Sequence, residues 1–176
     1  MLKYYLLRRQ SWYNRQVPTH GVLMNIITIR GGRKHQRKLA REVMDFCLRK
    51  LLPRTTTLDI NVRLNPRIEE VEGFCLCEDR NTFELEMDSR MPTDELIRTI
   101  CHEMVHVRQY FKRELRDMYG NKKAWKTRVY NEDRTDYLDL PWEKEAFKLQ
   151  DILYEEFIES DTSSDQSLKK SMYILG

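Results

Sequence analysis

The sequence predicts a fold of the α+β class. Three segments carry apolar residues at helical spacing, over 34–52, about 93–113 and 141–157. Between the first two, the run from Leu58 to Leu64 alternates strictly between apolar and polar residues, which is the pattern of a half-buried strand. This succession of a helix, several strands and two further helices predicts helices packed against a small sheet.

One domain of ordinary size accounts for the chain. Its 176 residues are 40% hydrophobic, which is enough for a single core. The longest apolar stretch, Val22 to Ile29, is interrupted by Asn25 and is much shorter than the roughly 20 residues that cross a bilayer. We therefore expect no membrane association.

The cysteines and the amino terminus indicate the compartment. Four cysteines are too few and too irregularly spaced for the disulfide framework of a small secreted protein. The first 16 residues mix charges and aromatic rings and lack the continuous apolar core of a signal peptide. An intracellular, cytoplasmic location with reduced thiols is expected.

Charge is distributed unevenly along the chain. The first 50 residues contain twelve Lys and Arg and two acidic residues, a net charge of +10, whereas the rest contains 19 and 26, a net charge of −7. Such a basic region is a candidate contact for nucleic acid or for an acidic surface, although a solvated helix face is the commoner explanation of such charges.

The first half of the chain contains one helix and three strands. The helix over 34–52 is stopped by Pro53. After the alternating strand, Phe74–Cys77 and Phe83–Met87 are two further strand candidates, separated by a polar stretch whose length fits a β-hairpin. The sheet is expected to be small and antiparallel.

The second half is dominated by helices. Thr93 is expected to cap a long helix that ends near Arg113 or Arg116, where basic side chains suit the helix dipole. Residues 117–140 show no period and are expected to be irregular. Pro141 then opens the last helix.

These patterns divide the chain into three parts. Residues 1–23 show no clear period and are expected to form a basic N-terminal appendage. Residues 24–159 form the domain itself. Residues 160–176 are rich in Ser and Asp and are expected to be a disordered tail.

A metal-binding motif lies inside the second helix. His102, Glu103 and His106 form the string HEMVH, which matches the H-E-x-x-H zinc pattern. Residues four apart project from one face of a helix, about 40° from each other, so two imidazoles can bind one ion while the adjacent Glu reaches its bound water. The flanking apolar residues cluster on the other side of this helix. The simpler interpretation is a pair of hydrogen-bonded histidines beside a solvated glutamate.

The third ligand is expected to be a carboxylate. The other two histidines, His20 and His35, precede the motif, and the residues after it lack the longer pattern with a third His. The helix that begins at Pro141 offers Glu143 and Glu145. They fall on opposite flanks of its apolar stripe, so helical periodicity does not choose between them.

The chain resembles minimal zincin metallopeptidases of the ImmA/IrrE type and, more loosely, SprT-like proteins. The resemblance spans roughly residues 34 to 158 and includes the order of helix, sheet, motif helix and a final helix with a Glu-Ala pair, here Glu145-Ala146. It implies a minimal zincin fold in which His102, His106 and Glu145 bind Zn²⁺, with Glu143 in reserve. Glu103 would be the general base.

The expected function is peptide-bond hydrolysis by a zinc-activated water, acting on a peptide or protein substrate. The strand over 83–87 is a candidate for binding substrate as an added strand, as the resemblance also implies. Three tyrosines, Tyr110, Tyr130 and Tyr137, are candidate oxyanion donors, and that role is left open. The alternative function is a zinc-stabilised module that binds nucleic acid or a protein partner through the basic N-terminal region.

Overall fold

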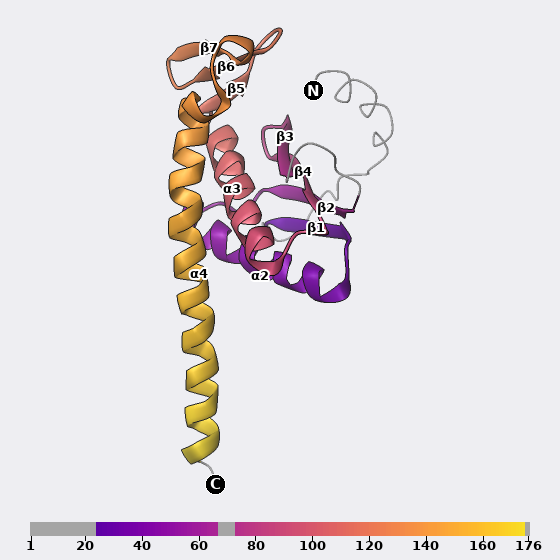
Figure 1. Ribbon diagram of the computed structural model, residues 1–176, viewed down its shortest axis with the longest axis vertical. Coiled ribbons are helices and arrows are strands. Elements are labelled where there is room, and N and C mark those ends of the chain that lie inside the picture. The colour runs from indigo at the N-terminus through magenta and orange to yellow at the C-terminus, as the bar shows by residue number, and fades with distance from the viewer. Residues whose placement is uncertain (1–23, 67–72, 175–176) are drawn as a thin grey trace.

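The computed structural model describes residues 24–66 and 73–174, with side chains described as far as Ser160. Within these ranges the chain is an α+β domain with three α-helices, a four-stranded sheet and a smaller three-stranded sheet, which confirms the predicted class (Figure 1). The expected appendage over 1–23 lies outside the described residues.

The larger sheet is mixed, so the prediction of an antiparallel sheet is wrong. Its strands are β1 (Ile26–Gly31), β2 (Asp59–Asn65), β3 (Gly73–Asp79) and β4 (Thr82–Asp88), in the order β1-β2-β4-β3. β2 pairs in parallel with both β1 and β4, and the antiparallel pair is the expected hairpin of β3 and β4. Alternation along a strand reports which face is buried and carries no information about the direction of the neighbouring strands.

One hydrophobic core joins this sheet to the helices. The apolar positions of β2 and β4 are at most 3% exposed and belong to the same buried cluster as the apolar faces of α2 (Lys34–Leu51) and α3 (Thr93–Phe111). Each fully buried aliphatic side chain contributes about 1.5–3 kcal/mol relative to an exposed one. The buried face of the sheet and the apolar faces of the two helices therefore form one core.

Helix α3 ends earlier than its basic residues suggest. Arg113 adopts a left-handed backbone conformation with φ 58°, and the Glu114 amide donates to the Gln109 carbonyl at 2.9 Å, which closes the helix after Phe111. A left-handed residue other than glycine costs about 1–2 kcal/mol, so the chain reversal is stabilised by the packing that follows it. At the other end, Pro92 occupies the N-cap position instead of Thr93.

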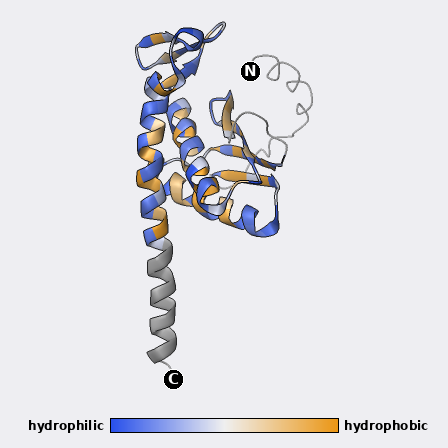
Figure 2. Ribbon diagram, viewed as in Figure 1, coloured by the Kyte–Doolittle hydropathy of each residue, from blue (hydrophilic) through white to orange (hydrophobic). Residues whose placement is uncertain are grey.

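The stretch predicted to be irregular contains a second sheet. Its three antiparallel strands are β5 (Leu115–Asp117), β6 (Lys122–Trp125) and β7 (Arg128–Asn131), and two short 3₁₀ turns, η1 (Glu132–Arg134) and η2 (Tyr137–Asp139), follow. Strands of three or four residues are too short to show a period in the sequence. Figure 2 shows that hydrophilic residues dominate this smaller sheet.

The last helix, α4 (Pro141–Ile174), packs lengthwise against α3 (Figure 1). Four residues of its predicted apolar stripe are buried, namely Trp142, Ala146, Leu153 and Phe157. The helix continues to Ile174, since extending an existing helix is much easier than starting one. That residues 160–176 are a disordered tail stays a prediction. Among the described helices, none has the length and apolar character needed to span a membrane.

Candidate metal centre

The two motif histidines face α4. His102 and His106 lie one turn apart on α3 and are 7% and 8% exposed, and Glu103 is 4% exposed. Their face was expected to be polar and away from the core, and it is buried because α4 covers the histidines and β3 lies close to Glu103. Because this imidazole pair is buried, its nitrogen atoms have only a few neighbouring groups as hydrogen-bond partners.

Three donor atoms converge between the helices. The Nε2 atoms of His102 and His106 are 3.1 Å apart, and Oε2 of Glu143 lies 3.2 Å from the first and 3.4 Å from the second. Two ligands on a tetrahedral zinc ion, each about 2.0–2.1 Å from it, lie about 3.3 Å from each other. The triangle therefore has the size of one face of a tetrahedral zinc site.

The opposite nitrogen atoms of both rings face side-chain carbonyl oxygens. Nδ1 of His106 lies 2.8 Å from Oε1 of Gln109, and Nδ1 of His102 lies 3.1 Å from Oε1 of Gln150. An amide oxygen only accepts hydrogen bonds, so a neutral ring carries its proton on Nδ1 and presents the lone pair of Nε2 to the triangle. Three converging lone pairs, one on an anion, need a cation among them, so these donors suit a bound metal.

Glu145 does not join this triangle. Its Oε2 accepts hydrogen bonds from Nη1 of Arg108 at 2.9 Å and from Nε2 of Gln109 at 3.0 Å. Two residues along a helix are about 200° apart, and the flank that meets the imidazoles is that of Glu143. The structure therefore brings the reserve residue Glu143 to the two histidines and holds Glu145, which the Glu-Ala resemblance had favoured, outside this group.

The buried charges of the site are strongly coupled. Burial opposes ionisation of Glu143, but hydrogen bonds with His102 and His106 outweigh it and hold the pKa of this carboxyl well below its usual range. Burial likewise opposes protonation of His106, yet its hydrogen bond with Glu143 and the charge of Glu103 raise its pKa. The two carboxyl groups thus favour a proton on His106, because both act to raise its pKa.

Glu103 lies beneath the edge of the larger sheet. Burial raises the pKa of its carboxyl, while the two imidazoles act in the opposite direction. Its Oε1 lies 3.3 Å from the place that a Cβ at Gly73 would occupy, so β3 passes close to this carboxylate. Its Oε2 is buried without a hydrogen-bond partner among the described residues.

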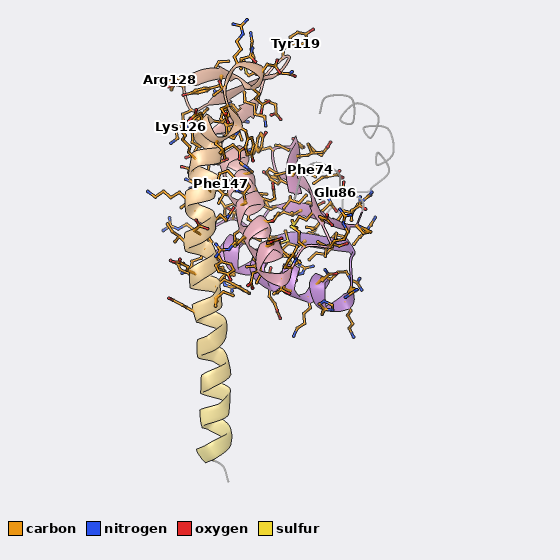
Figure 3. The ribbon with its side chains drawn as sticks, viewed as in Figure 1. Phe74, Glu86, Tyr119, Lys126, Arg128 and Phe147 are labelled. Atoms are coloured by element: carbon orange, nitrogen blue, oxygen red, sulfur yellow. The ribbon has the colours of Figure 1, made fainter. Side chains whose placement is uncertain are left out.

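An aromatic pair borders the site on its exposed side. The Phe147 ring packs 4.7 Å from the His102 ring, and the Tyr137 ring meets Phe147 edge-on at 6.3 Å. Phe147 is 37% exposed and Tyr137 53% exposed, so both also reach the surface, and Figure 3 shows Phe147 projecting from α4 beside α3. The hydroxyl of Tyr137 hydrogen-bonds with Glu143.

Of the three candidate oxyanion donors, Tyr137 contacts a proposed metal ligand, Glu143. The Tyr110 hydroxyl donates to Asp117 at 2.8 Å, and the Tyr130 ring packs edge-on against Trp142.

The sequence alone did not identify Gln109 and Gln150 as residues of the candidate site. Their helical spacing was the available signal, because Gln109 lies three residues after His106 and Gln150 lies seven residues after Glu143.

The strand predicted to bind substrate is not free to do so. β4 lies between β2 and β3 and pairs with both, whereas β3 forms the edge of the sheet in the described part of the chain. The exposed ladder closest to Glu103 is therefore that of β3.

No family model, curated protein or solved structure matches this chain.

Proposed function

We propose that the chain is a zinc-dependent metallopeptidase in which His102, His106 and Glu143 bind the metal and Glu103 is the general base. The observation that carries this proposal is a buried carboxylate with an unpartnered oxygen, Oε2 of Glu103, next to a three-atom donor set. An unpartnered buried oxygen is costly, so a site that keeps one usually has a use for it.

The donor set fits a catalytic zinc better than a structural one. Two imidazole nitrogens and one carboxylate oxygen are typical ligands of hydrolytic zinc sites, in which a fourth position is left for water. Structural zinc sites usually have four protein ligands and often include thiolates. Among the described residues the group contains three ligands and no cysteine.

The chemistry divides between the metal and Glu103. A bound zinc ion would supply Lewis acidity, which lowers the pKa of water and polarises a carbonyl group. Glu103 would accept the proton of the attacking water and deliver it to the leaving amine. Because burial raises the pKa of Glu103, its basicity is shifted toward the pH at which general bases work best.

The outer edge of β3, which pairs with no strand among the described residues, suggests how a peptide would lie. An extended peptide can add to an exposed edge through main-chain hydrogen bonds. A Cβ at Gly73 would lie 3.3 Å from Oε1 of Glu103, so a peptide along this edge would pass close to the general base. This interpretation moves the proposed substrate contact from β4 to β3.

The test is the variant Glu103→Gln, which keeps the shape of the side chain and removes its basicity. Zinc-loaded wild-type protein and the variant are given a peptide library, and cleavage is read by mass spectrometry. We expect equal zinc content and a loss of cleavage of about 100-fold or more in the variant. Exposed Glu155 on α4 gives the control, since Glu155→Gln should leave cleavage unchanged. Equal cleavage by Glu103→Gln and wild type would refute the mechanism.

A binding module with a structural zinc is the second candidate. In its favour, α2 exposes five basic side chains, namely Lys34, Lys38, Arg41, Arg49 and Lys50. Binding through phosphate contacts should weaken steeply between about 50 and 200 mM salt. A salt-dependent affinity for nucleic acid, together with absence of cleavage by the zinc-loaded wild type, would favour this candidate over the peptidase.

A further inference from the structure

Gln109 is held in one orientation. Its side chain is fully buried at 0% exposed, and its Nε2 donates to the Trp142 carbonyl and to Oε2 of Glu145, both at 3.0 Å. A carbonyl and a carboxylate oxygen can only accept, so the NH₂ group must face α4. Oε1 of Gln109 then has to face Nδ1 of His106.

This orientation determines which nitrogen of His106 can bind a metal. If the amide turned over, its NH₂ group would face Nδ1 and favour the tautomer with the proton on Nε2. That proton would point into the donor triangle and block the lone pair that the metal needs. Turning the amide over would also place its oxygen against the Trp142 carbonyl and the Glu145 carboxylate.

Glu145 is itself fixed in place. Its carboxylate accepts from Nη1 of Arg108 at 2.9 Å, and Nη2 of Arg108 lies 3.4 Å from Glu114. The Arg108 and Glu145 side chains are 17% and 25% exposed, so their contact is largely shielded from water. Hydrogen bonds that involve an ionised group are stronger than neutral ones, which makes the Glu145 contact the firmer of the two that hold Gln109.

We propose that Glu145 is a positioning residue for the metal centre, which acts through Gln109 to keep the proton of neutral His106 on Nδ1. The proposal concerns the metal site on which the proposed peptidase also depends, and it needs no peptidase activity to be tested. It assigns Glu145 a role different from that of a ligand, since its effect must pass through Gln109.

The test combines zinc affinity with histidine NMR. Glu145→Ala should weaken zinc binding about tenfold, as loss of an outer-shell partner typically does, whereas Glu145→Gln keeps an accepting oxygen and should stay close to wild type. In the metal-free protein at alkaline pH, ¹⁵N spectra should show the proton of His106 on Nδ1 in wild type and partly on Nε2 in Glu145→Ala. Exposed Glu155→Ala on the same helix is the matched control.

A double-mutant cycle separates this role from a merely structural one. Gln109→Met removes the amide, so zinc affinity should fall at least tenfold and adding Glu145→Ala should change it little further. Additive effects of the two substitutions, or wild-type zinc affinity and wild-type His106 tautomer in Glu145→Ala, would overturn the proposal. If Glu145→Ala and Glu145→Gln both lost zinc, and lost it whether or not Gln109 was also replaced, the proposal would be overturned in favour of Glu145 as a direct zinc ligand. If wild type bound no zinc, the NMR comparison would still decide the tautomer claim while the proposed function failed.

Discussion

Glu143 is a buried anion held between two imidazoles. It is 5% exposed, and its carboxylate is within 3.4 Å of Nε2 of both His102 and His106. An uncompensated carboxylate in such a place would be strongly unfavourable, so the anion and the positive charge beside it depend on each other.

Replacing Glu143 by Ala should therefore remove most of the metal affinity. Loss of one charged partner from a buried pair costs about 3–5 kcal/mol, which corresponds to a fall in zinc affinity of about 100-fold or more. Competition with a chromophoric chelator measures the zinc affinity of the variant and of wild type. Glu155→Ala should bind zinc like wild type. The assignment of Glu143 is contradicted if zinc affinity survives Glu143→Ala.

At the level of single residues, the sequence predicted part of the candidate site. The spacing of His102, Glu103 and His106 on a helix is local and can be read directly. The choice between Glu143 and Glu145 depends on how α4 is rotated against α3, and that rotation is determined by the packing of whole helices. The two glutamines that face the imidazoles depend on the same rotation.

The approach of β3 to α3 is the second determinant of the site. A Cβ at Gly73 would lie 2.8 Å from Cγ2 of Thr99 and 3.3 Å from Oε1 of Glu103. The first distance is too short for carbon atoms, so the Thr99 side chain, the strand or the helix would have to move. The absence of a side chain at Gly73 is thus a condition for the position of Glu103.

Gly73→Ala should displace Glu103 and leave the ligands in place. We expect zinc content close to one per chain and a fall in peptide cleavage of about tenfold or more, because a general base works only within hydrogen-bond reach of its proton. Zinc analysis and cleavage assays on the same sample measure both. Glu155→Ala, at an exposed position of α4, is the control and should leave zinc content and cleavage unchanged. Full cleavage by Gly73→Ala would show that β3 does not constrain the site.

Elements with a long periodic pattern were predicted and short ones were not. Helix α2 and strand β2 agree with the sequence to within one residue, because the patterns of their apolar residues extend over several turns or pleats. The strands from β5 to β7 have at most four residues, and their pairing is set by contacts with α3 and with one another. Whether neighbouring strands of the larger sheet run parallel or antiparallel likewise depends on the path that the chain takes between them.

Across the whole molecule, the proposed metal centre would join α3 to α4. Its candidate ligands come from positions about 40 residues apart, so a bound ion would cross-link the two helices. A ligand that binds only the folded chain stabilises it by about 4 kcal/mol at a thousandfold excess over its dissociation constant.

Zinc should therefore raise the melting temperature. For a chain of this size, about 4 kcal/mol corresponds to a shift of about 8–16 °C. Differential scanning calorimetry with zinc and then with excess chelator measures the shift and its reversal. The variant with both His102→Asn and His106→Asn should show none. A shift of the same size in that variant would mean that zinc binds elsewhere.

X-ray absorption at the zinc edge of the loaded wild-type protein tests the central claim most directly. The account predicts four-coordinate zinc with two imidazole nitrogens and two oxygens, one from Glu143 and one from water, at about 2.0–2.2 Å. Sulfur in the first shell, or a third imidazole, would contradict the assignment of His102, His106 and Glu143 as the ligands of an open catalytic site.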